Sequence, residues 1–162
     1  LDRIVNLLPY IKREIKNIKL IIVGEDWNQK EQLIKRAKKL NVYKNVKFFG
    51  AVTHENIHKF LLNSDVFLLS SDYEGFGISV IEAMSVGLPV VVNDIASMRT
   101  IIRNGVNGYI VNFDDSTKTA KIIINLLKDR KLATKIGNAS RTYSKKYDWY
   151  NVVSSVEKIY KN

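Results

Sequence analysis

Residues 72–84 of this chain read Asp-Tyr-Glu-Gly-Phe-Gly-Ile-Ser-Val-Ile-Glu-Ala-Met, and this stretch decides the fold. Glu74 and Glu82 have seven residues between them. A Gly-Phe-Gly turn follows the first acid, and an apolar helical pattern carries the second. The apolar run at residues 66–69 reads as a buried strand, so the sequence predicts a strand, a glycine turn and a helix start. We call residues 72–84 the signature segment.

The glycine turn of the signature segment is suited to an anion. Gly75 and Gly77 let the chain turn sharply and let a ligand approach the backbone closely. The amides near Gly77, Ile78 and Ser79 would be the unpaired donors of the first helical turn, at the positive end of the helix dipole. This arrangement predicts a phosphate cradle with one acid on each side of it.

The two acids differ in their expected surroundings. Glu82 follows Ile78 by four residues, so both lie on one helix face, and its sequence neighbours are apolar. A carboxylate there is costly to bury unless it is hydrogen-bonded, and a sugar diol could supply two hydroxyl donors. Glu74 is expected in the crevice at a strand end, where it would accept from neutral hydroxyls rather than face a phosphate. The alternative is that both are ordinary solvated acids.

Strands and helices alternate along the rest of the chain. The pattern predicts helices at residues 3–16, 31–40, 55–62, 78–86, 98–102, 117–128, 131–146 and 149–160. It predicts strands at residues 19–23, 46–49, 66–69, 89–92 and 109–111. Gly87 is expected to cap the helix of the signature segment. The fold class is therefore α/β, with a doubly wound, Rossmann-like parallel sheet.

The run from Glu74 to Val91 resembles the signature of the retaining GT-B glycosyltransferases of the group 1 family, whose members read E-G-F-G-x-x-x-x-E-A-M-A-x-G-x-P-V-V. Further stretches resemble family motifs in the same order, at residues 20–24, 46–50, 64–71, 104–111 and 147–149. The resemblance implies that residues 1–162 form the C-terminal, nucleotide-sugar (donor) binding domain. The N-terminal acceptor domain of such an enzyme is absent from this chain.

The resemblance also implies a reaction and a set of roles. A hexosyl group would move from a UDP- or GDP-type sugar to a hydroxyl of a glycan or lipid-linked acceptor, with retention at the anomeric carbon. Glu74 would be the catalytic carboxylate, in contact with the sugar, and Glu82 would hold the ribose hydroxyls. The implied donor-binding residues are Val52, Thr53, Glu74, Gly75, Phe76, Gly77, Ile78 and Glu82. Polysaccharide, lipid-linked glycan and glycolipid acceptors all fit.

No metal or other cofactor is expected. His54 and His58 have the i, i+4 spacing of helical metal ligands, but no third ligand is apparent. The family's diphosphate-binding Arg and Lys precede the region where this chain begins, and residues 96–100 read Ala-Ser-Met-Arg-Thr where members carry Gly-Gly-x-x-Glu. We therefore expect the isolated chain to bind the donor weakly and not to catalyse transfer.

Length and composition limit the number of domains, the possible cross-links and the possible binding partners. The 162 residues suffice for one domain, and the absence of cysteine excludes disulfides and is consistent with the cytoplasm. The net charge of +10 has three open interpretations: a solvated surface, attraction of nucleotide sugars, or contact with an anionic membrane surface. The last would place the protein peripherally at the cytoplasmic membrane face. Nucleic acid is not expected as a partner, because aromatic residues do not alternate with the basic groups.

Two other functions remain open at this stage. One is a non-catalytic nucleotide-sugar sensor or interaction module, which the altered residues 96–100 favour and the two acids disfavour. The other is a different GT-B enzyme, an epimerase or a phosphorylase. A phosphorylase of the pyridoxal phosphate type needs a cofactor lysine, and none stands out.

Overall fold

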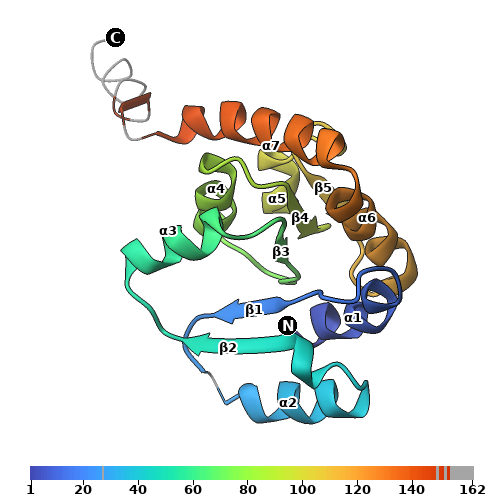
Figure 1. Ribbon diagram of the computed structural model, residues 1–162. Coiled ribbons are helices and arrows are strands. Elements are labelled where there is room, and N and C mark those ends of the chain that lie inside the picture. Colours follow the sequence, from blue (N-terminus) through green and yellow to red (C-terminus); the bar gives the residue numbers. More distant parts are fainter. Residues whose placement is uncertain (27, 149, 152, 154–162) are drawn as a thin grey trace.

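Parallel strands alternate with helices along the chain (Figure 1). The computed structural model describes residues 1–26, 28–148, 150, 151 and 153. Its helices are α1 Asp2–Glu14, α2 Lys30–Lys39, α3 His54–Leu62, α4 Ile78–Ser85, α5 Ala96–Ile101, α6 Ser116–Lys128 and α7 Arg130–Ser144, with short 3-10 turns at Tyr43–Asn45 and Lys145–Tyr147. Its strands are β1 Leu20–Val23, β2 Val46–Gly50, β3 Phe67–Leu69, β4 Val90–Asn93 and β5 Tyr109–Val111.

All strand pairs in the described ranges are parallel, and they form two ladders. β1 pairs with β2, with Leu20 opposite Val46. β4 lies between β3 and β5 in the second ladder. Within the described ranges no strand pairing joins β1 to β3. The two ladders are instead joined by side chains, because Leu20 and Leu68 pack against the same buried cluster.

The β3–β5 ladder has a helical layer on each side. Alternation along β4 turns Val91 toward a cluster with α1 and α6, while Val90 and Val92 pack with α4 and α5. A third cluster joins α1 and α2 to the β1–β2 ladder. This doubly wound arrangement confirms the predicted α/β class. None of the helices in the described part of the chain is long and apolar enough to cross a membrane.

Helix α4 is held from behind by α7. Gly87, the second residue after the last one of α4, has a left-handed φ of 83°, as expected for a helix-ending glycine. A Cβ on Gly137 of α7 would lie 2.1 Å from the Gly87 carbonyl oxygen. The two helices therefore approach so closely that only a glycine fits at residue 137, and this contact fixes the position of α4.

The predicted elements are confirmed in kind, with small shifts at their ends. The first helix was predicted to residue 16, but it ends at Glu14 because Ile15 is extended. The short helix predicted at residues 98–102 begins earlier, at Ala96. The helix predicted at residues 131–146 becomes α7 and a 3-10 turn that ends at Tyr147. Most of the helix predicted at residues 149–160 lies outside the described residues.

Candidate functional site

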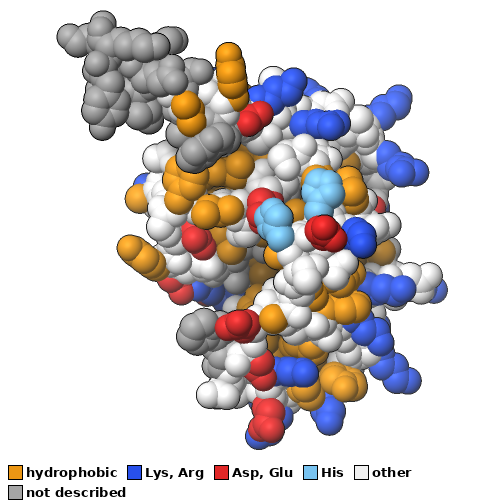
Figure 2. All heavy atoms as spheres, turned by 90° about the vertical axis from the view of Figure 1, so that its left-hand side faces the viewer, with side chains coloured by type: hydrophobic (Ala, Val, Ile, Leu, Met, Phe, Trp, Pro, Cys, Tyr) orange, Lys and Arg blue, Asp and Glu red, His pale blue; other side chains and the backbone are white. Residues whose placement is uncertain are grey.

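The signature segment lies where β3 ends and α4 begins, at the carboxyl edge of the strands. The strand arrows of β1 and β2 point to the left in Figure 1, toward this edge. Figure 2 looks onto it. The chain's two histidines, in pale blue, lie beside acidic side chains, whereas most lysines and arginines lie along the right-hand rim of this face. The centre of the face is therefore not a basic surface.

The glycine turn leaves backbone donors open. Gly77 is the N-cap of α4 and has a left-handed φ of 79°, which favours glycine. Its carbonyl accepts from the amides of Val80 and Ile81 at 3.0 and 3.2 Å. Within the described residues, no acceptor is found for the amides of Gly77, Ile78 or Ser79. These three N–H groups are what an anion at the helix N-terminus would meet.

Glu74 and Glu82 flank that turn. The Cγ atom of Glu74 lies 3.7 Å from where a Cβ on Gly77 would be, so the acid lies against the turn. Glu82 is one helical turn further on, and its side chain is 28% exposed. Its Oε1 atom lies 3.5 Å from Nδ1 of His54 at the start of α3. The predicted acids thus lie on either side of the open amides.

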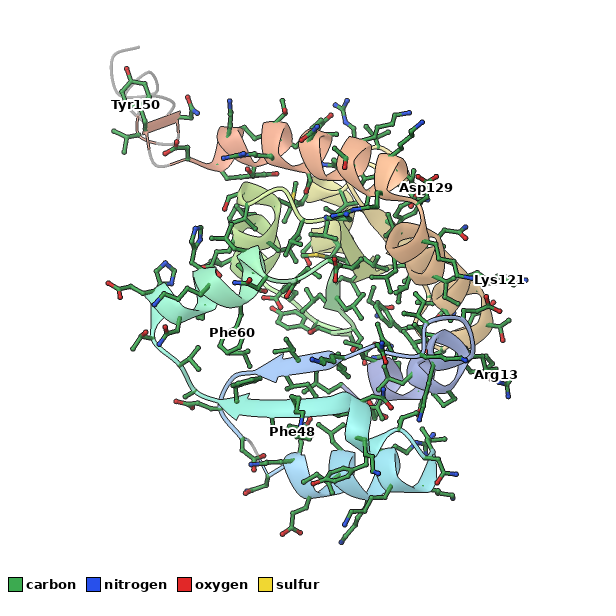
Figure 3. All side chains as sticks on the ribbon, viewed as in Figure 1. Arg13, Phe48, Phe60, Lys121, Asp129 and Tyr150 are labelled. Carbon is green, nitrogen blue, oxygen red and sulfur yellow. The ribbon has the colours of Figure 1, made fainter. Side chains whose placement is uncertain are left out.

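Val52 and Thr53 belong to the loop that leads from β2 into α3. Thr53 is the N-cap residue of α3, and its carbonyl accepts from the amides of Asn56 and Ile57, both at 3.0 Å. Its hydroxyl makes no capping bond. Figure 3 shows Phe60 extending from α3 toward β2, where its ring lies 4.6 Å from that of Phe49, centroid to centroid. The His54–Glu82 contact brings this loop to the signature segment.

Arg3 in the first turn of α1 ties the beginning of the signature segment in place. Its guanidinium donates to the Asp72 carboxylate, and a second nitrogen lies 3.7 Å from Asp114. This hydrogen bond holds the pKa of Asp72 below its ordinary value, against the opposing effect of desolvation. Asn93 at the end of β4 donates to the Ser71 carbonyl at 3.2 Å. The loop after β3 is therefore fixed by α1 and by β4.

Residues 96–100, where the sequence departs from the family pattern, form most of α5. Met98 is fully buried, and its Cε atom would lie 2.6 Å from a Cβ on Gly77. Arg99 donates to Asp94 at 2.6 Å, and this bond lowers the pKa of that carboxyl. The segment thus contacts the glycine turn through an apolar side chain, while its cation is engaged with a neighbouring acid.

An aromatic contact links the signature segment to the end of α7. Phe76 and Tyr147 meet edge to face, with ring centroids 5.7 Å apart. The Lys146 ammonium lies 5.0 Å from the Tyr147 ring centroid. Tyr147 is therefore a packing residue. The aromatic residues that follow it would also be expected to pack rather than to stack on a sugar, but Tyr150 is 78% exposed, and Trp149 and Tyr160 lie outside the described residues.

Several residues that shape the site were missed by sequence reasoning. Arg3 and Asn93 carry no motif, and their partners are distant in sequence. His54 was weighed only as a metal ligand, although its position four residues after Gly50 places it on the same edge as Glu82. In the described part of the chain, no group of three or more His, Cys, Asp or Glu side chains is gathered in a way that could hold a metal ion.

Solved structures with this architecture define the class. A TarM variant from S. aureus, crystallised with fondaparinux, alpha-GlcNAc-glycerol and UDP, superposes with a TM-score of 0.86 at 27% identity, over 99% of this chain and 32% of that one. HepE from Anabaena, crystallised with UDP and glucose, gives a TM-score of 0.82 at 21% identity, over 98% of this chain and 43% of that one. The fold is the Rossmann-like α/β domain of the GT-B glycosyltransferases.

The family follows from the sequence comparisons. A family model described as glycosyl transferases group 1 matches residues 1–143. The chain is 31% identical over 162 residues to an uncharacterised glycosyltransferase of Methanocaldococcus jannaschii, covering 99% of this chain and 41% of that protein. It is 28% identical over 158 residues to the phosphatidyl-myo-inositol mannosyltransferase of Mycobacterium leprae, covering 97% and 41%. The chain belongs to the group 1 glycosyltransferases, and it spans about two fifths of the length of these relatives.

Proposed function

We propose that this chain is the donor-binding domain of a retaining glycosyltransferase. The whole protein would transfer a hexosyl group from a UDP- or GDP-type sugar to a hydroxyl of a glycan or lipid-linked acceptor. The observation that carries the proposal is the row of open amides at Gly77, Ile78 and Ser79 between Glu74 and Glu82. Family membership and the UDP named in the complexes of HepE and TarM support it.

The proposed roles follow from charge and position. The open amides and the positive end of the α4 dipole would bind the diphosphate. Glu82 would accept hydrogen bonds from the ribose hydroxyls, and Glu74, lying against the turn, would accept from hydroxyls of the sugar. The backbone at Val52 and Thr53 would edge the base. Gly75 and Phe76 would complete the turn around the sugar phosphate.

The proposed chemistry needs no protein base. The bond from the anomeric carbon to the leaving phosphate oxygen breaks, and the bond to the acceptor oxygen forms on the same face. The acceptor proton passes to the leaving phosphate. Helix dipoles and cations offset the charge that develops on the diphosphate, and we propose that no metal or other cofactor takes part. The diphosphate cations and the acceptor site would come from an N-terminal domain of the same protein, so the isolated chain would bind donor but not catalyse.

Calorimetric titration with UDP, GDP, ADP and their sugar conjugates tests the proposal. One nucleotide class should bind saturably, and Glu82→Ala should weaken it about ten-fold or more, since hydrogen bonds to a charged group are lost. Glu31→Ala, which removes an exposed acid of α2, is the matched control and should bind like the wild type. Absence of binding at millimolar nucleotide, or equal binding by both variants, would contradict the proposal.

One observation favours a second function, a non-catalytic nucleotide-sugar-binding or interaction module. Where the family pattern has two glycines and an acid, α5 carries Ala96 and Ser97, and Arg99 is paired with Asp94. Activity of the complete protein that contains this domain distinguishes the two functions. Sugar transfer that is lost in Glu74→Ala supports the enzyme, whereas nucleotide binding without any transfer supports the module.

We further propose a cytoplasmic location, with an anionic membrane surface as a peripheral contact if the acceptor is lipid-linked. The net charge of +10 supports this contact. Sedimentation with vesicles of anionic phospholipid tests it: the chain should pellet with them at low salt and be released at high salt. Equal behaviour with neutral vesicles would contradict it.

A further inference from the structure

The Glu82 carboxylate has one side-chain partner in the described part of the chain, the imidazole of His54. The Oε1–Nδ1 separation of 3.5 Å is an electrostatic contact rather than a short hydrogen bond. The contact engages one of the two carboxylate oxygens. Since a carboxylate has two oxygens and about four acceptor positions, most of its capacity stays open to a ligand.

The fold holds the backbone of His54 in place, at the start of α3. His54 is the first residue of α3, directly after the N-cap Thr53, and the carbonyl of Thr53 already accepts two amides of that helix. The Phe49–Phe60 ring contact fixes α3 against the end of β2. The imidazole therefore comes from the start of α3, directly after the loop from β2, while Glu82 comes from α4; Ile57 and Leu61 of α3 pack in the same cluster as α4.

The exposed fractions of the two side chains also point to a ligand. Glu82 is 28% exposed, and His54 is 85% exposed. A buried pair would serve to stabilise the fold, and a fully exposed pair would contribute little to stability or binding. Here a half-buried acid is contacted by an imidazole that lies almost entirely in solvent. A group that binds Glu82 from the open side would meet His54 at the same time.

We propose that His54 is a positioning residue for ribose recognition: it orients the Glu82 carboxylate toward the diol of a bound nucleoside diphosphate. This inference rests on the proposed function, because it requires that Glu82 binds the ribose. A polar contact at Oε1 limits rotation of the carboxylate and leaves Oε2, for which no partner is found among the described residues, open to the hydroxyl donors. His54 itself need not contact the nucleotide.

The test is calorimetric titration of the 162-residue chain with whichever of UDP, GDP and ADP it binds, and with the matching 2′-deoxynucleotide. His54→Ala should weaken binding of the ribonucleotide about three- to five-fold, the scale of a partly exposed polar contact. Binding of the deoxynucleotide should change much less, because the diol is then incomplete. His54→Asn, which keeps an N–H donor near the Nδ1 position, should restore most of the loss.

The controls separate positioning from a general effect on α3. His58→Ala removes an exposed imidazole from the next turn of the same helix and should bind like the wild type. In a Glu82→Gln background, His54→Ala should have no further effect. Equal losses for ribo- and deoxynucleotide, or additive losses in the double variant, would overturn the inference. A wild-type chain that binds no nucleotide would instead overturn the proposed function.

Discussion

Met98 of α5 lies directly against Gly77 at the start of α4: a Cβ on the glycine would be 2.6 Å from the Cε atom of the methionine. Gly77 also has a left-handed backbone, with φ of 79°. Two features therefore fix the turn that carries the open amides: the left-handed backbone of Gly77 and the buried side chain of Met98 packed against it. A ligand on the open side would meet a turn with little freedom to move away.

We expect Gly77→Ala to destabilise the fold. The left-handed conformation costs an alanine about 1–2 kcal/mol, and the Met98 methyl group must also move. Chemical denaturation followed by circular dichroism measures this loss. Gly75→Ala is the matched control, because Gly75 lies in the same turn and nothing within 4 Å would contact the new Cβ. Equal stability of the two variants would contradict this account.

The Arg3–Asp72 pair should make stability depend on pH. Its hydrogen bond lowers the pKa of Asp72 in the folded protein. The stabilisation is thus complete above the unfolded-state pKa of about 3.9 and is lost as the pH falls through the lower folded-state pKa. Asp72→Asn should be less stable than the wild type near neutral pH, and the difference should shrink in acid.

Asp65→Asn is the control for that experiment, because Asp65 is an exposed acid for which no ion pair is found in the described part of the chain. Urea denaturation at several pH values measures both variants. A difference between wild type and Asp72→Asn that grows as the pH falls would show the opposite sign and would exclude the pair as its cause.

Gly137→Ala should destabilise the chain although alanine is the better helix former. The new Cβ would lie 2.1 Å from the Gly87 carbonyl oxygen, which is backbone and cannot swing away, so α7 must move off α4. The expected cost exceeds the gain of about 1 kcal/mol in helix propensity. Asn138→Ala, at the exposed neighbouring position, should be neutral or slightly stabilising in the same thermal melt. A more stable Gly137→Ala would contradict the close helix contact.

Asn107 should be the stability-critical side chain of the loop before β5. It is fully buried, accepts from the Arg103 amide at 2.7 Å and donates to the Ile101 carbonyl at 3.1 Å. Asn107→Ala would leave both backbone groups unpaired, at about 1–3 kcal/mol each. Val106→Ala, at the half-exposed residue beside it, should change the unfolding free energy by less than about 0.5 kcal/mol. A small effect of Asn107→Ala would mean that water replaces the amide.

The fold was predictable because its signals are local. Apolar runs such as residues 66–69 and 89–92 became strands, and the glycines at 77 and 87 mark the beginning and end of α4 as expected. Helix ends were less predictable. Ile15 continues the apolar spacing of α1 yet is extended, since the chain must turn there into β1. The break between the two ladders has no sequence signal.

The site was predictable in part, for a related reason. Glu74, Gly77 and Glu82 lie within one short segment, so the glycine turn and the first turns of α4 place them together. Arg3, His54 and Met98 reach the same segment from α1, α3 and α5. Their contacts depend on how those helices pack, and a single sequence carries no periodic pattern for such long-range pairs.

The break between the β1–β2 and β3–β5 ladders also bears on how the domain responds to a ligand. Side-chain packing across this break permits small sliding movements that ladder hydrogen bonds would prevent, although α1 packs against both ladders. A nucleotide held by residues 52–53, directly after β2, and by Glu82 of α4 would link the two ladders. In the nucleotide-bound protein, hydrogen exchange should therefore show the amide protons of both ladders exchanging together, as those of a single cooperative unit.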